Sequence, residues 1–587
     1  MNSSNSVQST SYDIVDYPGH ALAQAHPDRL STLASLFGIL PPTIATCRIL
    51  ELGCGDGVNL MSVAHALPQA RCVGIDLAAS GIKKGQAIAS GLGVTNVELK
   101  QFDIMDVGQE FGKFDYIIAH GIYSWIPESV RDKLLAICKA NLSENGVAYI
   151  SYNTYPGCHL RKMIREMMKY HVSEMETPQQ KIEQGRALIK FLAESSTDEP
   201  DFYRNILAKE YARVSQHSES SVFHDDLADT NHPVYFHQFV EHAEKHGLQY
   251  LSEAQFFEMQ SGIFAPEAVD VVNQISDSRV AKEQYLDFLK CRSFRQTLLV
   301  HKEQALDFDV SPERVTKFYI GSPIHPQDEI VHLGSPDIVT FLGPEKSSLK
   351  IDKPIIKAAL VVLGNAWPQA VHFDDLLARA QTLLAASTPV NPFHEPEFKG
   401  RVDQAQRIHR GEHRSPFFMM DGGSASLDPP YNVSAVHGLW AVSVPPIQAT
   451  RNEEDKRTLA EVLLRAYAGG IVEFHLHPPQ FVTLPSERPI ASPLARLQAR
   501  NGSNIINLRH HNIKVEDSLG RGLLQLLDGT RDRHALIASL DELVVTGKAS
   551  LPESSTIPNG ATGTRDIIKA NLEENLIALG RLALLAA

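Results

Sequence analysis

The feature that most constrains this chain is a short stretch, residues 48–57, which reads RILELGCGDG. It is an apolar strand that runs into three glycines at alternate positions, and residues 58–67 then have the apolar spacing of a helix. Glycines allow a tight turn and a close approach of the backbone to a ligand, and a helix start points free N–H groups at the same place. The stretch therefore predicts a turn that cradles a nucleotide-like ligand.

The spacing of the glycines narrows the ligand. A dinucleotide turn, G-x-G-x-x-G, would need its third glycine at Val58, but that glycine falls one position earlier, at Gly57. A Walker loop is excluded because no G-K-[ST] sequence follows. Glu51, two residues before the first glycine, suits a cationic or amino-bearing ligand better than a pyrophosphate. The alternative is a glycine-rich loop that caps an ordinary α/β unit, and the loop alone does not separate the two.

Length and charge bound the kind of protein. At 587 residues the chain should hold three or four domains of about 150 residues. The net charge of −14 makes the surface a poor partner for nucleic acid or an anionic membrane. No stretch approaches the roughly 18 apolar residues of a spanning helix, so we expect no membrane insertion. Residues 1–10 are rich in Ser and Asn and lack the features of a signal peptide, which predicts a disordered tail.

The cysteines indicate a compartment. The six cysteines are scattered and no two form a C-x-x-C pair, which argues against a zinc site and against a disulfide framework. We therefore expect a cytoplasmic protein that needs no metal for its reaction.

Strands and helices alternate through the first 152 residues. Strands are predicted at 48–52, 71–76, 97–102, 114–119 and 146–152, with helices at 58–67, 79–90 and 128–142. This rhythm predicts an α/β fold with a parallel, Rossmann-like sheet covered by helices on both faces. Ligands of such sheets bind outside the carboxyl ends of the strands, so functional residues should lie at those ends.

Acidic residues stand at three of those strand ends. They are Glu51, Asp76 and Asp103, and the fourth and fifth strands end at His120 and Tyr152. Asp76 can accept hydrogen bonds from ribose hydroxyls, and Asp103 can reach an adenine amino group. A single Asp after a strand is more often a helix cap. Three acidic residues at successive strand ends beside a glycine loop are much less expected by chance.

These motifs resemble those of the class I S-adenosylmethionine (AdoMet)-dependent methyltransferases. The first motif of that class matches ILELGCGDG at 49–57, its second acidic residue matches VGID at 73–76, and its third matches FD at 102–103. The strand-four motif matches FDYIIA at 114–119. The resemblance implies that AdoMet is the cofactor.

Longer phrases resemble a bacterial group with a "methyltransferase regulatory" domain, which includes the rickettsial protein lysine methyltransferases. The phrases are HPDRL at 26–30, AHGIYSW at 119–125, SYNTYPG at 151–157, NHPVYF at 231–236 and FRQTLL at 294–299, preceded by the segment 12–18. The resemblance implies an AdoMet core, an inserted dimerisation region, a middle domain and a winged-helix C-terminal domain. The methyl acceptor in that group is lysine on an outer-membrane protein.

The expected domains follow from the pattern of strands and helices together with the resemblance to the bacterial group. The methyltransferase core is predicted at 11–157 and 232–303, because the last two strands of the sheet are found far downstream, near 248–253 and 297–302. Residues 158–231 read as a helical insertion, either a dimer interface or a lid, or else an intramolecular packing layer. A middle domain is expected at 308–400 and a winged-helix-like domain at 401–587.

The predicted cofactor site combines the strand ends with their neighbours. Tyr12 and Tyr17 are expected to form a lid over the cofactor, with plain packing as an equal alternative. The cofactor-binding residues we expect are Tyr12, Tyr17, Glu51, Gly53, Cys54, Gly55, Asn59, Asp76, Leu77, Asp103, Ile104, His120 and Gly121.

The predicted acceptor site lies after strands four and five. Aromatic rings there can hold a lysine ammonium by cation–π contact, and an apolar channel lowers the pKa of the amine that must lose its proton. His120 could act as the general base, contact the cofactor, or satisfy a buried carbonyl, and Trp125 could instead pack on the core. The catalytic candidates are His120, Tyr123, Trp125, Tyr152, Asn153 and Tyr155.

The sequence thus predicts an AdoMet-dependent methyltransferase, expected to be a homodimer, that methylates lysine side chains of a protein. Two alternatives remain open: a small-molecule methyltransferase, and a regulatory protein that senses AdoMet without transferring its methyl group. No nucleic-acid partner is expected, because acidic residues interrupt the basic residues of the region 496–533.

Overall fold

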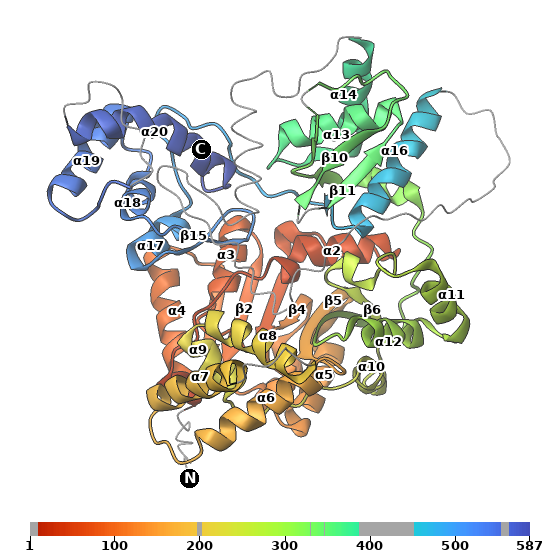
Figure 1. The fold of residues 1–587 in the computed structure, drawn as a ribbon, viewed down its shortest axis with the longest axis vertical. Helices are drawn as coiled ribbons and strands as arrows, with labels where there is room; N and C mark the ends of the chain where they lie inside the picture. The colour runs from red at the N-terminus through yellow and green to blue at the C-terminus, as the bar shows by residue number, and fades with distance from the viewer. Residues whose placement is uncertain are drawn as a thin grey trace. The chain divides into compact units, whose positions relative to one another are not determined.

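The computed structural model describes residues 10–195, 202–328, 330–344, 347–386, 451–552 and 563–586 (Figure 1). It divides into two compact units. The first comprises Met1–His20, Pro41–Ala254 and Glu267–Gln304, and the second comprises Ala21–Leu40, Gln255–Pro266 and Ala305–Ala587. The predicted tail at 1–9 and the junction of the two predicted C-terminal domains, 387–450, lie outside the described residues.

The first unit is built on a seven-stranded sheet with the order β3-β2-β1-β4-β5-β7-β6. The first five strands are parallel, and β7 runs antiparallel to both β5 and β6. The mainly parallel, Rossmann-like sheet confirms the predicted fold class. The strands are β1 (Arg48–Leu52), β2 (Arg71–Asp76), β3 (Val97–Gln101), β4 (Phe114–Ala119), β5 (Leu142–Asn153), β6 (Leu248–Glu253) and β7 (Phe294–His301).

Helices between the strands follow the predicted rhythm. The apolar strands β1 and β4 are buried almost throughout, which is why they read as continuous hydrophobic runs. The predicted end of the second helix at Gly91 is wrong, because the helix continues to Leu92 and is capped by Gly93 in the left-handed conformation, φ 66°. The helices are α3 (Val58–Ala66), α4 (Ala79–Leu92), α5 (Glu128–Asn141), α10 (Phe236–Lys245), α11 (Pro266–Ile275) and α12 (Arg279–Lys290).

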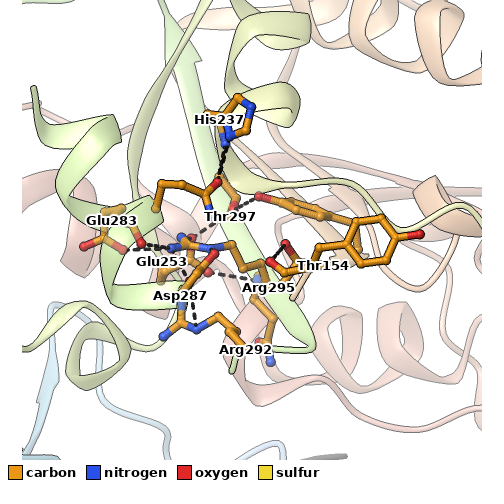
Figure 2. A network of polar contacts seen from close by, with 12 residues as sticks. Thr154, His237, Glu253, Glu283, Asp287, Arg292, Arg295 and Thr297 are labelled. Carbon is orange, nitrogen blue, oxygen red and sulfur yellow. Dashed lines mark hydrogen bonds and ion pairs between the residues drawn. The ribbon is translucent and has the colours of Figure 1, made fainter. Parts of the chain in front are cut away.

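A buried arginine ties the last strands to the helix between them (Figure 2). The Arg295 guanidinium on β7 donates to Glu253 Oε1 at 2.6 Å, to Glu283 Oε2 at 3.0 Å and to both carboxylate oxygens of Asp287 at 2.8 Å. It also stacks over the ring of Phe236, 3.7 Å from the ring centroid. All three carboxylates are buried, and burying a negative charge is costly unless a cation pairs with it. Arg295 supplies such a cation to all three.

The helical insertion folds around its own small core. Buried residues such as Ile164, Met168, Ile182 and Ile189 form one apolar cluster, which the helical spacing of the sequence predicts. The third helix of this layer and the π-helical turn after it were not predicted individually. The elements are α6 (Cys158–His171), α7 (Pro178–Glu194), α8 (Phe202–Gln216), α9 (Glu219–Ser221) and the π-helix η6 (Val222–Asp226).

The first α-helix of the second unit is α2 (Pro27–Leu36), which has a proline in its first turn. The central part carries two three-stranded sheets, ordered β11-β10-β9 and β12-β8-β13. Their strands are β8 (Tyr319–Gly321), β9 (His325–Pro326), β10 (Val339–Leu342), β11 (Ser348–Ile351), β12 (Val371–His372) and β13 (Glu473–His475), and the helices are α13 (Pro354–Ala366), α14 (Phe373–Ala385) and α16 (Arg451–Ala468).

The C-terminal part of this unit is winged-helix-like. A β-hairpin follows its first helix, and apolar residues from helices and hairpin share one core. The elements are α17 (Pro493–Asn501), β14 (Asn504–Ile506), β15 (Asn512–Lys514), α18 (Ser518–Leu526), α19 (Arg533–Val545) and α20 (Thr564–Arg581). In the part of the chain that the structure describes, no helix combines the length and the apolar character needed to cross a membrane.

Arg295→Met should destabilise the first unit by about 3–5 kcal/mol, because it removes the cation that contacts all three buried carboxylates, although Arg292 still pairs with Asp287 at 3.4 Å. Urea unfolding followed by tryptophan fluorescence and circular dichroism would measure the loss. The control is Lys162→Ala, which removes an exposed pair with Glu166 and should cost less than about 1 kcal/mol. Equal, small shifts in both variants would contradict the role given to Arg295.

Candidate cofactor and acceptor site

The glycine loop after β1 is held in a conformation that only glycine adopts easily. Gly53, Gly55 and Gly57 all have positive φ, at 72°, 56° and 69°. A Cβ atom would lie 2.5 Å from Ile122 at position 53 and 2.6 Å from Leu99 at position 57, but it would meet nothing within 4 Å at position 55. The middle glycine thus leaves room for a ligand, while the outer two are packed against the protein.

Asp76, at the end of β2, lies beside this loop. Its Oδ2 accepts a hydrogen bond from the Gly55 backbone N–H at 2.8 Å, and its Oδ1 accepts one from Ala78 N–H at 2.8 Å. Burial raises the pKa of the Asp76 carboxyl above its ordinary value, although these backbone donors oppose the shift. The structure therefore brings together the first two predicted cofactor motifs, and the contact of Asp76 with a ribose stays a prediction.

Glu51 supplies an unfilled acceptor next to the loop. Its side chain is 3% exposed, and Oε1 accepts a hydrogen bond from Asn59 Nδ2 at 3.1 Å. Oε2 is buried and has no partner among the described residues. Burial raises the pKa of the Glu51 carboxyl to about 8, and the charges of Asp56 and Asp76 push in the same direction. A buried carboxylate with one empty acceptor position fits a ligand that brings an amino group or a positive charge.

Asp103, after β3, is held as a helix cap. Its Oδ1 accepts a hydrogen bond from Met105 N–H at 2.8 Å and starts the short helix η3 (Ile104–Asp106). Asp103 therefore has the helix-capping role that the sequence analysis gave as the alternative for a single Asp after a strand. A contact of Asp103 with adenine stays a prediction. Of the neighbours predicted to bind cofactor, Cys54 is buried, Ile104 is half-buried and Leu77 is 45% exposed.

The two predicted lid tyrosines contact the insertion. The Tyr12 ring, on α1 (Ser11–Ile14), stacks on His224 with 4.2 Å between centroids. The Tyr17 hydroxyl donates to Asp225 Oδ2 at 3.5 Å. Sequence reasoning missed His224 and Asp225, because they lie in the π-helix η6 and belong to no motif.

The same N-terminal segment also contacts the cofactor side of the sheet. Asp13 accepts hydrogen bonds from the N–H and the hydroxyl of Ser80 on α4, at 3.1 and 2.9 Å. The pKa of Tyr12 is raised to about 12 by burial and by the negative charges of Asp225 and Asp76. The segment thus spans from α4 to η6 near Asp76, as a lid would, and its contact with the cofactor stays a prediction.

His120, at the end of β4, is neutral and half-buried. Its Nδ1 lies 2.9 Å from the Tyr149 hydroxyl, which in turn donates to Gln296 Oε1 at 3.3 Å. Burial, with a smaller contribution from His20, lowers the pKa of His120 to about 4. This chain of hydrogen bonds fits a proton on Nδ1 and a lone pair on Nε2. Tyr149 was not predicted, because its position inside a buried strand gives no sign of a polar role.

Gly121 follows in the left-handed conformation, φ 66°, and a Cβ atom there would meet nothing within 4 Å. Its N–H donates to Ser151 Oγ on β5 at 2.7 Å. Like Gly55, it leaves open space at the carboxyl edge of the sheet, which is what a predicted cofactor contact requires.

Tyr123 and Tyr152 lie in the interior of the unit. Each is 1% exposed. The Tyr123 hydroxyl lies 2.8 Å from His242 Nδ1, whereas Tyr152 stacks on Phe239 at 4.0 Å and its hydroxyl lies 3.0 Å from Thr297 Oγ1. Both rings are therefore part of the packed interior of the first unit. Their predicted direct contact with an acceptor stays untested.

Trp125 and Asn153 are fixed by neighbours from the insertion and the strand-four loop. The guanidinium of Arg165, on α6, lies 5.4 Å from the Trp125 ring centroid. Asn153 donates its backbone N–H to Ser124 Oγ at 2.9 Å and its Nδ2 to Asn231 Oδ1 at 3.1 Å. Among the described residues, nothing donates a hydrogen bond to Asn153 Oδ1, which leaves an acceptor at the end of β5.

Tyr155 belongs to a group of rings just beyond β5. It stacks on His159 with 4.0 Å between centroids, and Tyr235 lies 5.2 Å from it. His159 Nε2 is 3.3 Å from the Tyr235 hydroxyl. Tyr155 and Tyr235 are half-buried and His159 is exposed, so the group faces solvent in part. Tyr235 could have been found from the phrase NHPVYF, but its proximity to Tyr155 depends on the fold.

The sheet order, the glycine loop after β1 and the acidic strand ends together define a class I methyltransferase fold. Three family models match the chain: a methyltransferase domain at residues 45–207, a predicted methyltransferase regulatory domain at 218–301, and the PKMT C-terminal winged helix domain at 487–584.

Two curated relatives and one solved structure match large parts of the chain. Protein RP789 of Rickettsia prowazekii is 36% identical over 378 residues, 64% of this chain and 68% of that protein. Protein RP028 of the same organism is 40% identical over 235 residues, 40% of this chain and 94% of that protein. The solved structure of PKMT2 from Rickettsia typhi, determined also in complex with AdoHcy, has a TM-score of 0.77 and 26% identity, and covers 97% of this chain and 100% of its own.

The chain belongs to the family of methyltransferases that join a regulatory domain and a PKMT-type winged helix to a class I catalytic sheet. The predicted resemblance and winged helix are confirmed. The methyltransferase domain, together with the neighbour that holds AdoHcy, also confirms AdoMet as the cofactor.

Replacing Glu51 should remove a pH dependence of cofactor binding. Below its pKa of about 8 the carboxyl is protonated in the free protein, so a cationic ligand must first displace that proton. Affinity for S-adenosylhomocysteine should therefore rise with pH from 6 to 8, by up to about 10-fold per pH unit, and level off above. Titration calorimetry at each pH would measure it.

Glu51→Gln should make this profile nearly flat, whereas Glu98→Gln, which alters an exposed strand residue, should leave it unchanged. The amino group of the ligand titrates equally with all three proteins, so the difference between the profiles isolates Glu51. Parallel profiles for wild type and Glu51→Gln would contradict its assignment to the cofactor site.

Proposed function

We propose that this protein is a cytoplasmic protein lysine N-methyltransferase that transfers the methyl group of AdoMet to a lysine side chain by in-line displacement. The observation that carries the proposal is the length of the likeness to PKMT2, 97% of this chain, which includes the winged-helix part as well as the catalytic sheet. The solved neighbour is named PKMT2, and the winged helix model that matches this chain carries the same PKMT name. A protein substrate also gives a use to the large second unit.

Residues at the carboxyl ends of the sheet strands have different roles in binding AdoMet. AdoMet, when bound, supplies an electrophilic methyl group on a sulfonium. Glu51 offers its unfilled oxygen to a positive or amino-bearing part of the cofactor, and Asp76 holds the glycine loop in place. The open positions at Gly55 and Gly121 let the cofactor approach the backbone. The N-terminal segment with Tyr12 closes over this side and excludes water.

A lysine acceptor makes one further demand, since its ammonium must lose a proton before it can attack. Tyr155 and the rings beside it can hold the cation, and an apolar environment lowers the amine pKa. Asn153 Oδ1 can accept a hydrogen bond from the amine and orient its lone pair toward the methyl group. Burial keeps His120 neutral, so its Nε2 lone pair can accept a hydrogen bond near the acceptor, while its pKa of about 4 makes it a weak base for the released proton.

The location and assembly belong to the same proposal. All six cysteines are free, and five of them are buried, as suits a reducing compartment.

The insertion exposes large apolar side chains on three successive helices: Tyr170 at 86%, Phe191 at 64% and Phe202 at 79%. A surface of this kind supports a homodimer formed through the insertion. Sedimentation should then show a dimer that Phe191→Asp weakens.

The acceptor class can be decided with labelled cofactor. Purified protein is incubated with methyl-labelled AdoMet and a bacterial cell or envelope extract, and the label is followed in proteins and in small molecules. Label on lysine in a protein band supports the proposal. Label in the small-molecule fraction would instead make the protein a small-molecule methyltransferase, and tight AdoMet binding without any transfer would make it a sensor.

Asn153→Ala should lower methyl transfer by about 5- to 150-fold, the loss of one hydrogen bond to a reacting group, while S-adenosylhomocysteine affinity stays the same. Asn145→Ala, at the opposite end of β5, is the matched control and should retain full activity. Single-turnover rates with the labelled protein substrate would measure both. An unchanged rate for Asn153→Ala would remove Asn153 from the acceptor site.

A further inference from the structure

Two histidines and an aspartate converge on the surface of the first unit, away from the residues assigned to the cofactor. His242 lies in the last turn of α10, His246 is the C-cap residue of that helix, and Asp132 faces them from α5. Asp132 Oδ1 is 2.8 Å from His246 Nε2 and 3.5 Å from His242 Nε2. One ligand atom from each residue lies within 4.8 Å of the other two. Imidazole nitrogens and a carboxylate oxygen are the donors that zinc takes in proteins.

The His242 ring is oriented by a residue behind it. Its Nδ1 lies 2.8 Å from the hydroxyl of the buried Tyr123, so its Nε2 points toward Asp132. A metal-binding histidine typically has its second nitrogen held by a hydrogen bond in this way, which fixes the ring and its tautomer. In the tautomer that carries its proton on Nδ1, the His242 Nε2 lone pair faces Asp132 and can bind a cation.

The two helices hold these side chains on a fixed frame. Phe239, Val240 and Ala243 are buried on α10, and Leu134 and Leu135 are buried on α5. The histidines are separated by four residues, which places both on one face of the helix. A site on packed helices needs little rearrangement to bind an ion.

Access and charge also favour an ion. The side chains of His242 and His246 are 22% and 18% exposed, and that of Asp132 is 62% exposed, so an ion can enter from solvent. Among the described residues, Asp132 forms ion pairs with these two histidines and with no lysine or arginine. No described lysine or arginine therefore competes with a metal cation for this carboxylate.

We propose that Asp132, His242 and His246 bind a divalent first-row transition cation, with Zn²⁺ as the best fit, and that water completes its coordination. Three protein ligands leave at least one position open. Asp132 lies in the segment that matches the methyltransferase domain, and the histidines lie in the segment that matches the regulatory domain. The ion would tie the regulatory segment to the catalytic sheet. The proposal is independent of which molecule accepts the methyl group.

Metal binding would be measured on tag-free, full-length protein stripped with a chelator and dialysed against Zn²⁺. Elemental analysis should find that the wild-type protein holds one more Zn²⁺ per chain than each of three variants. The variants are Asp132→Ala, His246→Ala and His246→Gln. The last variant keeps a hydrogen-bond donor near Asp132 but supplies a poor zinc ligand. His237→Ala, on the same helix but outside the cluster, is the matched control and should bind as the wild type does. Tyr123→Phe should weaken Zn²⁺ binding by about 10- to 100-fold.

Co²⁺ should give a tetrahedral or five-coordinate absorption spectrum with the wild type and His237→Ala, and none with His246→Gln. Added Zn²⁺ should raise the midpoint of thermal unfolding of the wild type and of His237→Ala, but not that of His246→Gln. Circular dichroism and S-adenosylhomocysteine affinity show that each variant is folded. Equal Zn²⁺ content in wild type and His246→Gln, or no bound Zn²⁺ in either, would overturn the proposal and leave a hydrogen-bonded cluster.

Discussion

The buried guanidinium of Arg295 is the interaction on which the catalytic sheet depends. It brings together carboxylates from β6 and α12 with its own strand, β7, and β7 then pairs along β5. The end of β5 carries Asn153 and leads into Tyr155, so the position of the predicted acceptor side follows from this pairing. A charge of this kind contributes little net stability when its partners are present, because desolvation offsets attraction. What it does is penalise any other arrangement, since Glu253 and Glu283 would lose their ion pairs with Arg295 and Asp287 would keep its pair with Arg292.

This arrangement gives the regulatory segment a structural meaning. Residues 218–301 match a regulatory domain, yet β6, β7, α10 and α12 complete the catalytic sheet and its covering helices. The segment is thus part of the methyltransferase fold. The proposed cation between α5 and α10 would lie at this junction, and Tyr123 connects it to the aromatic rings behind β5.

The cofactor half of the site could be predicted from sequence because its residues are local. Glu51, the glycines and Asp76 stand at the ends of strands whose order follows from the α/β rhythm, and the glycine φ angles are dictated by the turn itself. The acceptor half could not be predicted to the same depth. Tyr123 and Tyr152 have the same sequence appearance as Tyr155, yet they are buried against Phe239 and His242, which come from a helix about a hundred residues away. Only the packing of that helix distinguishes a supporting ring from a surface ring.

The sequence by itself indicated the fold class through its hydrophobic periodicity, and it indicated the cofactor and the family through the resemblance of its motifs to those of known methyltransferases. It also located the last two strands far downstream, although it set the start of β7 three residues too late. The tertiary structure decided which side chains meet: Tyr12 with His224, His120 with Tyr149, and Asp132 with His242 and His246. The physical reason is that hydrogen bonds, ring stacking and metal ligation require contact distances of a few ångströms. Sequence spacing fixes such distances within one helix or turn, but not between segments that the chain brings together only by folding.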